Sequence, residues 1–192
     1  MKSLSLFLIG SLLCVSCAKN EKQDEATQSA NIEKEKKAIA ATIEKETQSF
    51  FARDYEAWKS NYAQTDYAFQ AWSNDDGTFD SNVGWEDINK QIGKYIAENP
   101  EPVSSHPKVE RKNMLYKFYG DNVAYLTWDQ FNSDKPEKYF HHSKEVRLME
   151  KINGEWKIVC VSAFWDYKNL IPASKLPMIQ KIANESRGKN KI

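Results

Sequence analysis

The residues best suited to chemistry lie in the C-terminal third of the chain, on either side of Asn153-Gly154. This dipeptide separates two stretches with alternating apolar residues, which predicts a β-hairpin with a two-residue turn. Such a turn places His141 opposite Asp166 on neighbouring strands. A carboxylate beside an imidazole fixes its tautomer and raises its proton affinity, so the pair could act as a general base. The alternative is a stabilising contact at the rim of the sheet.

The same register gives the hairpin one mixed face and one apolar face. The mixed face pairs Glu145 with Ser162 and Arg147 with Cys160, and its other pairs are Met149 with Ile158 and Ser143 with Phe164. The apolar face carries Val146, Leu148, Val159, Val161, Ala163 and Trp165. A mixed face of this kind is expected of a pocket wall. Arg147 with Glu145 could also be a structural ion pair, and a one-residue slip would invert both faces and exchange His141 for His142.

No metal or cofactor is expected. The neighbouring His141 and His142 must point to opposite faces of a strand, and His106 precedes a proline in a loop, so no three ligands cluster. The chain has no glycine-rich loop for phosphates. Cys160 has no activating neighbour in the sequence and is expected to serve as packing.

Composition excludes some function classes. The 192 residues include 27 Lys and Arg against 27 Asp and Glu, with no strongly basic stretch, which argues against nucleic-acid binding. The apolar share of 41% and the 24 aromatic residues suffice for one well-filled core.

The first 16 residues have the pattern of a cleaved leader. Met1-Lys2 precedes an uncharged run from Leu4 to Val15, which is too short to span a bilayer as a helix. Cys14-Val15-Ser16-Cys17 resembles the lipobox of bacterial lipoproteins, which implies lipidation of Cys17 and a membrane anchor in the cell envelope, on the outer membrane facing the periplasm or the exterior. A secreted protein cleaved nearby is the alternative.

Helices are predicted before strands. Residues 17–31 are polar and are expected to form a flexible tether. A helical stripe follows from Ile32 to Phe50, Asp54 is placed to cap a short second helix, and a third helix is expected between Gly84 and Glu98.

Strands are expected in most of the remaining chain. An aromatic strand is expected at 66–73, and two hairpins at 109–119 with 123–131 and at 139–152 with 155–167. Helices followed by a meander of antiparallel strands indicate an α+β domain, here residues 32–167, whose sheet wraps over the helices. Residues 168–192 form a tail with a weak helical pattern in Leu176, Ile179 and Ile182.

Four segments in this order resemble the nuclear transport factor 2-like superfamily, including SnoaL-like proteins. They are residues 51–66 (with FARDYEAW), 84–88 (GWEDI), 119–125 (YGDNVAY) and 153–159 (NGEWKIV). The resemblance implies a cone-shaped, strongly bent antiparallel sheet wrapped over three N-terminal helices, with a pocket at its open end and often a dimer formed through the sheet. Ser162 falls where many such proteins place a pocket histidine. The superfamily spans isomerases, cyclases, dehydratases and members without known chemistry, so the fold does not fix the function.

The function expected from the sequence is that of a lipid-anchored, non-catalytic module binding a small apolar or aromatic molecule. The expected pocket residues are Tyr55, Trp58, Tyr62, Trp72, Trp128, Glu145, Arg147, Cys160 and Ser162. One alternative is a lyase or isomerase with His141 as base, Asp166 orienting it, and Tyr62 or Arg147 polarising a carbonyl. Another is a protein-interaction module that forms a homodimer through the apolar face with Val146, Val159, Val161 and Trp165.

Overall fold

The computed structural model describes residues 16–103 and 107–177, and the chain divides into two units, Met1–Ala38 and Ile39–Ile192. Helix α1 (Ser16–Ala52) runs through both. Residues 17–31, which were expected to form a flexible tether, are helical and belong to α1. They are rich in Ala, Glu, Lys and Gln, which are strong helix formers. Residues 1–15 of the expected leader, with His106, Ile179 and Ile182, lie outside the described residues.

Two further helical segments belong to the second unit. Asp54 caps α2 (Tyr55–Lys59) as predicted, its Oδ1 accepting from the Ala57 amide at 2.9 Å. The third expected helix is α3 (Trp85–Ile88), a π-helical turn (Asn89–Gly93) and α4 (Lys94–Glu98) in succession. No helix within the described residues is both long and apolar enough to cross a membrane.

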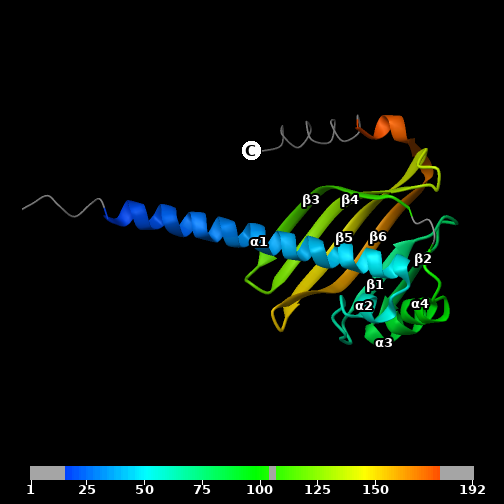
Figure 1. Ribbon diagram of the computed structural model, residues 1–192, viewed down its shortest axis with the longest axis horizontal. Coiled ribbons are helices and arrows are strands. Elements are labelled where there is room, and N and C mark those ends of the chain that lie inside the picture. The colour runs from blue at the N-terminus through cyan, green and yellow to red at the C-terminus, as the bar shows by residue number, and fades with distance from the viewer. Residues whose placement is uncertain (1–15, 104–106, 178–192) are drawn as a thin grey trace, which may run out of the picture. The chain divides into compact units, whose positions relative to one another are not determined.

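Six strands form one curled sheet in the order β2-β1-β6-β5-β4-β3 (Figure 1). Their bounds are β1 (Phe69–Ser73), β2 (Phe79–Val83), β3 (Val109–Tyr119), β4 (Val123–Ser133), β5 (Tyr139–Ile152) and β6 (Glu155–Pro172). Neighbouring strands are antiparallel except β1 and β6, which are parallel, so the sheet is mixed rather than wholly antiparallel. The α+β class and the bent sheet over N-terminal helices are confirmed.

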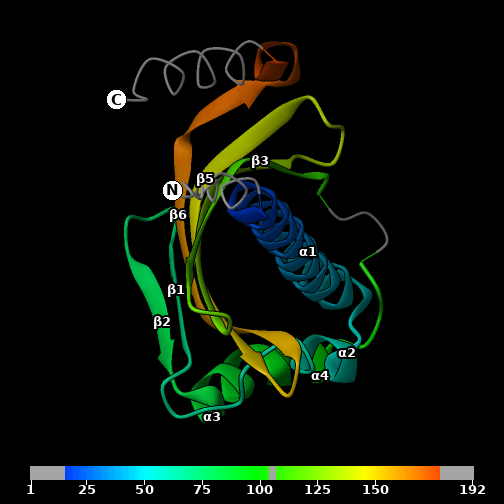
Figure 2. The ribbon, with the colours of Figure 1, turned by 90° about the vertical axis from the view of Figure 1, so that its left-hand side faces the viewer.

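The sheet bends around the C-terminal part of α1, and α2, α3 and α4 lie at one end of the curve (Figure 2). We call the side that faces α1 the concave face and the other side the convex face. The core fills the concave side, where Ile39 and Ile43 of α1 pack with Trp58, Ile88 and Trp128. The tail expected from residue 168 begins as strand, because β6 continues to Pro172, and Leu176 then packs on Phe131 and Phe140.

The last hairpin has the predicted turn but not the predicted register. Asn153 and Gly154 both have positive φ, 53° and 83°, as a type I′ turn requires, and Met149 does pair with Ile158. Beyond that pair Val159 is an extra residue on β6, so Leu148 faces Cys160, and the pairs from there to His142 with Asp166 are displaced by one. Such a bulge turns the rest of the strand over.

The bulge has a packing cause. Ile158 is held by the chain after α2, since its amide donates to the Asn61 carbonyl at 2.8 Å and its carbonyl accepts from the Ala63 amide at 2.9 Å. Ile158 and Val159 are consecutive and both buried, which strict alternation in a strand does not allow. The extra residue therefore lets two adjacent apolar side chains leave water.

As a result, the two predicted faces of the hairpin are exchanged on β6 only. Ser143, Glu145 and Arg147 of β5 lie on the concave face as expected, but Val161 joins them there in place of Cys160 and Ser162. The predicted apolar face therefore does not exist as one surface, because Val146 is convex, Val159 is in the bulge and Val161 is concave.

A polar cluster lies on the convex side of β4 around the buried Asp129. Its carboxylate accepts from Asn113 Nδ2 and His142 Nε2, each at 2.9 Å, and from Lys144 Nζ. Burial alone raises the pKa of Asp129, but hydrogen bonds from Lys144, Asn113 and His142 outweigh burial and lower this pKa to about 2.

We expect Asp129 to make the free energy of unfolding depend on pH in the acid range. A carboxyl whose pKa is lower in the folded chain stabilises it fully above the unfolded value of about 3.9, and this stabilisation is lost as the pH falls towards about 2. The loss should reach about 2 kcal/mol. Urea unfolding at pH 5 and pH 2 would measure it, and Asp129→Asn should show a smaller fall. An equal fall in both proteins would contradict this role.

Candidate ligand-binding site

A cavity of about 330 Å³ opens on the concave side of the sheet, between α1, α2 and the strands. Eight of its lining residues are apolar or aromatic, and six are polar or charged. The lining residues are Glu46, Thr47, Phe50, Phe51, Trp58, Tyr62, Gln70, Trp72, Ile92, Val109, Gln130, Asn132, Arg147 and Val161. Both the size and this mixture are typical of small-molecule sites, which enclose about 300–1,000 Å³.

Tyr62 joins two of the polar wall groups. Its hydroxyl donates to Glu46 Oε1 and accepts from Gln70 Nε2, both at 2.9 Å. Burial raises the pKa of Tyr62 well above its usual value of 10.0; the negative charge of Glu46 raises it further, and the positive charge of Arg147 opposes this. Tyr62 is therefore a neutral hydroxyl at ordinary pH, oriented by its two partners.

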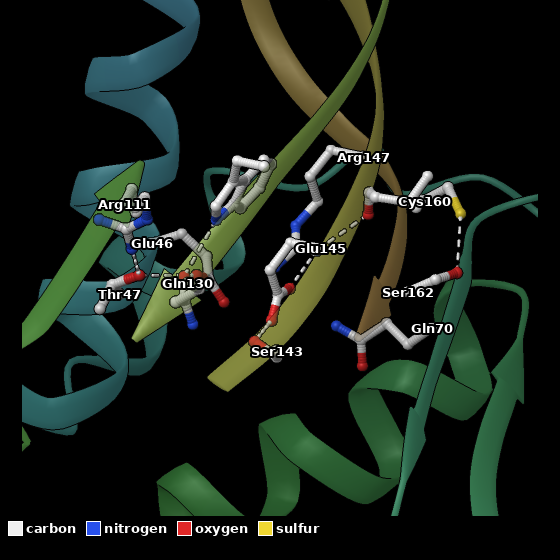
Figure 3. A network of polar contacts seen from close by, with 12 residues as sticks. Glu46, Thr47, Gln70, Arg111, Gln130, Ser143, Glu145, Arg147, Cys160 and Ser162 are labelled. Atoms are coloured by element: carbon white, nitrogen blue, oxygen red, sulfur yellow. Dashed lines mark hydrogen bonds and ion pairs between the residues drawn. The ribbon is translucent and has the colours of Figure 1, made fainter. Parts of the chain in front are cut away.

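Arg147 enters the cavity from β5 with its charge partner beside it. Its NH1 group donates to Glu145 Oε2 and to the Val146 carbonyl, both at 2.9 Å. Glu145 is only 1% exposed, and its other oxygen accepts from Ser143 Oγ at 2.6 Å. The guanidinium also lies over the Trp128 ring, 4.9 Å from its centroid. Alternation along β5 brings Ser143, Glu145 and Arg147 to the same face, as Figure 3 shows.

Several polar atoms of the wall residues are buried and unpaired. Trp58 Nε1, Gln70 Oε1 and Asn132 Oδ1 have no hydrogen-bond partner in the part of the chain that the structure describes. Gln70 is 4% exposed, so water does not reach its amide freely. A buried polar atom without a partner destabilises a protein by about 1–3 kcal/mol. Residues of the cavity wall thus have hydrogen-bonding capacity that the described residues do not use.

The structure brings four of the nine expected pocket residues to the cavity wall, namely Trp58, Tyr62, Trp72 and Arg147. Trp128 and Glu145 lie behind the wall and hold Arg147 in place. Tyr55 is outside the lining, and its hydroxyl donates to Asn89 Oδ1 at 2.9 Å.

Cys160 and Ser162 were wrongly expected in the pocket. The bulge turns both to the convex face, where Cys160 Sγ lies 3.8 Å from Ser162 Oγ (Figure 3). Ser162 therefore does not occupy a pocket position, and a histidine in its place would not face the cavity either.

The predicted His141–Asp166 pair does not form, again because of the displaced register. Asp166 lies opposite His142, whose Nε2 bonds Asp129, and the Asp166 carboxylate accepts from Asn169 Nδ2 at 2.9 Å. The His141 ring instead lies 6.0 Å from that of Tyr167. Across residues 16–103 and 107–177, no group of three or more His, Cys, Asp or Glu side chains could hold a metal ion.

Sequence reasoning did not identify most of the polar wall as a site. Glu46, Gln70, Gln130 and Asn132 were missed, although Gln70 is two residues from Trp72 and Gln130 two from Trp128 on their strands. Strand alternation from those aromatic residues would have found both glutamines. Glu46 lies three residues after Ile43 and four before Phe50, on the buried side of α1.

Comparison with known proteins bears on the fold alone. No protein-family model matches the sequence, and no curated protein matches it. Among solved structures, an NTF2-like protein of unknown function from Shewanella oneidensis is similar over 67% of this chain and 98% of its own, with 15% identity and a TM-score of 0.50.

Two further solved structures give the same result. A cystatin-like fold protein of unknown function from Nostoc punctiforme matches 69% of this chain and 92% of its own, at 14% identity and a TM-score of 0.51. The association domain of Caenorhabditis elegans CaMKII matches 68% and 95%, at 13% identity and a TM-score of 0.52. The curled sheet over N-terminal helices is therefore the NTF2-like, or cystatin-like, fold, as the sequence motifs indicated.

Proposed function

We propose that this protein binds a small, mainly apolar molecule in the concave cavity and does not transform it. The observation that carries the proposal is the cavity of about 330 Å³, whose wall combines aromatic rings with polar side chains, among them Gln70 and Asn132, each with an unpaired oxygen. A ligand with one or two polar groups would satisfy these atoms while its apolar part contacts the rings. The lyase or isomerase alternative loses its base, because His141 and Asp166 are apart.

Filling the cavity tests the proposal. Val161 lines the cavity and Ser162, its neighbour on β6, points to the opposite face. Native mass spectrometry of the protein from its own host should show a retained small molecule. Val161→Phe should lower its occupancy at least tenfold, and Ser162→Phe should leave it unchanged. Equal occupancy in the two variants, or no retained molecule in the unaltered protein, would contradict the proposal.

We also propose that the chain is anchored to the cell envelope through lipid on Cys17. The support is the uncharged run from Leu4 to Val15, followed by Ser16-Cys17 and a charged segment. The same mass spectrum tests this proposal. It should show acyl chains on Cys17, whereas a chain cleaved elsewhere and without acyl mass would contradict it.

A homodimer through the convex face is a second candidate. One row of side chains crosses five strands there in register, formed by Tyr125, Leu148, Cys160, Phe69 and Val83. Nearby on the same face, Phe164 is 62% and Phe79 72% exposed. An apolar sheet face of this kind fits a second copy of itself. The association-domain neighbour shares this fold, which is compatible with assembly.

Light scattering of the full chain would test this candidate. We expect twice the chain mass, falling to a single chain in Phe164→Glu, because a charge at the centre of an apolar interface must be desolvated. Tyr139→Glu, at the beginning of β5, is the matched control and should leave the mass unchanged. A single-chain mass at high protein concentration would exclude the dimer.

A further inference from the structure

We propose that the cavity selects uncharged ligands over anionic ones, and that Glu145 is the residue that sets this preference. The inference rests on the proposed binding function and specifies its ligand as an uncharged ring compound with a carbonyl or hydroxyl group. An arginine in an aromatic pocket would ordinarily suggest an anionic ligand. The surroundings of Arg147 in this cavity favour an uncharged ligand instead.

The charge of Arg147 is already neutralised. Arg147 is the only cationic side chain among the lining residues, and Glu145 Oε2 lies 2.9 Å from its NH1. Because Glu145 is 1% and Arg147 8% exposed, water and salt do little to weaken this attraction. A ligand carboxylate would therefore compete with a carboxylate that is already in place.

The remaining charge at the wall is negative. Glu46 lines the same cavity, and it and Arg147 both act on the Tyr62 hydroxyl. The nearby Arg111 does not alter this balance, because its own NH1 pairs with Glu44 Oε2 at 2.6 Å. An anion entering the cavity would meet two carboxylates and one guanidinium, and it would also lose its hydration.

The wall can still bind neutral polar groups. The described contacts of Arg147 use NH1 only, which leaves Nε and NH2 as donors for a carbonyl or hydroxyl oxygen. Gln70 Oε1 and Asn132 Oδ1 can accept from a ligand hydroxyl. Hydrogen bonds of this kind need correct placement of donors and acceptors but no net charge. Aromatic side chains such as Trp58, Trp72 and Phe50 would contact the ring system.

Two probes of nearly the same shape test the preference. 2-Acetylnaphthalene is an uncharged ketone, and 2-naphthoate is an anion at neutral pH. Calorimetric titration of the purified full chain should give at least tenfold tighter binding for the ketone. In Glu145→Gln, which keeps the side-chain shape and removes the charge, 2-naphthoate should bind at least tenfold more tightly than it does to the unaltered chain. Ser143→Ala removes a hydrogen bond to Glu145 but keeps its charge, and should leave the preference unchanged.

Each of these measurements either supports or overturns the proposed preference for uncharged ligands. Equal or tighter binding of 2-naphthoate to the unaltered chain would overturn the inference, even if Glu145→Gln does not fold. An unchanged preference in a folded Glu145→Gln protein would also overturn it. Val161→Phe separates this inference from the function on which it rests. The proposed binding function itself fails if Val161→Phe binds both probes normally, or if neither probe binds the unaltered chain. Only the present inference fails if the unaltered chain binds both probes equally well and Val161→Phe abolishes that binding.

Discussion

Replacing Arg147 by alanine is expected to lower the free energy of unfolding by about 3–5 kcal/mol. Glu145, which is 1% exposed in the structure, would lose its counter-charge, and the hydroxyl of Ser143 would be its only described partner. An ionised carboxylate in that position lacks both water and a cation, so the folded state loses most of the pairing energy. Urea denaturation followed by circular dichroism would measure the change.

The double variant Glu145→Met/Arg147→Met is the control for this prediction. Two apolar side chains of similar volume leave no unpaired charge, and such replacements of buried ion pairs are often neutral or stabilising. The double variant should therefore be clearly more stable than Arg147→Ala. If the single substitution costs less than about 1 kcal/mol, the pair lies in a more polar environment than its burial indicates.

Trp58→Ala is expected to destabilise the protein by a similar amount, about 3–5 kcal/mol. Trp58 is fully buried, and its ring contacts those of Tyr62 and Trp85 at centroid distances of 4.9 and 5.8 Å. Alanine would remove these contacts and enlarge the cavity beside them, into which the helices can relax only in part. Thermal and urea unfolding would both report the loss.

A matched substitution at the surface separates packing from the mere loss of an aromatic ring. Tyr119 at the end of β3 is 59% exposed, and Tyr119→Ala should change the stability by about 0.5 kcal/mol or less. Comparable losses in the two variants would mean that Trp58 is not a packing centre of the core.

Most elements of this fold, though not β2, could be predicted because their signals are local. Asn153-Gly154 specifies the turn between β5 and β6, and Asp54 caps α2 as its position indicated. The ends of β3 and the bounds of β5 match the expected segments 109–119 and 139–152. Short-range turn and capping chemistry determines each of these features within a few residues.

The composition of the site could be predicted only in part, because it depends on contacts distant in sequence. The bulge arises where Ile158 meets the chain after α2, nearly a hundred residues earlier, and the hairpin sequence does not contain that partner. Residues between the turn and the bulge, such as Met149 and Ile158, were placed correctly. Cys160 and Ser162, which lie beyond the bulge, were not. Trp58, Tyr62 and Trp72 were found because bulky aromatic side chains tend to be buried whether they lie on a helix, in a loop or on a strand.

The extra residue in β6 has a consequence for how such a protein can diverge. Deleting the single codon for Val159 would remove the extra residue and leave Cys160 opposite Leu148 and Val161 opposite Arg147, as they are now. The cavity would keep its present wall, and the chain would lose one buried apolar side chain. A bulge at this position can therefore be gained or lost in evolution without altering what the interior offers a ligand.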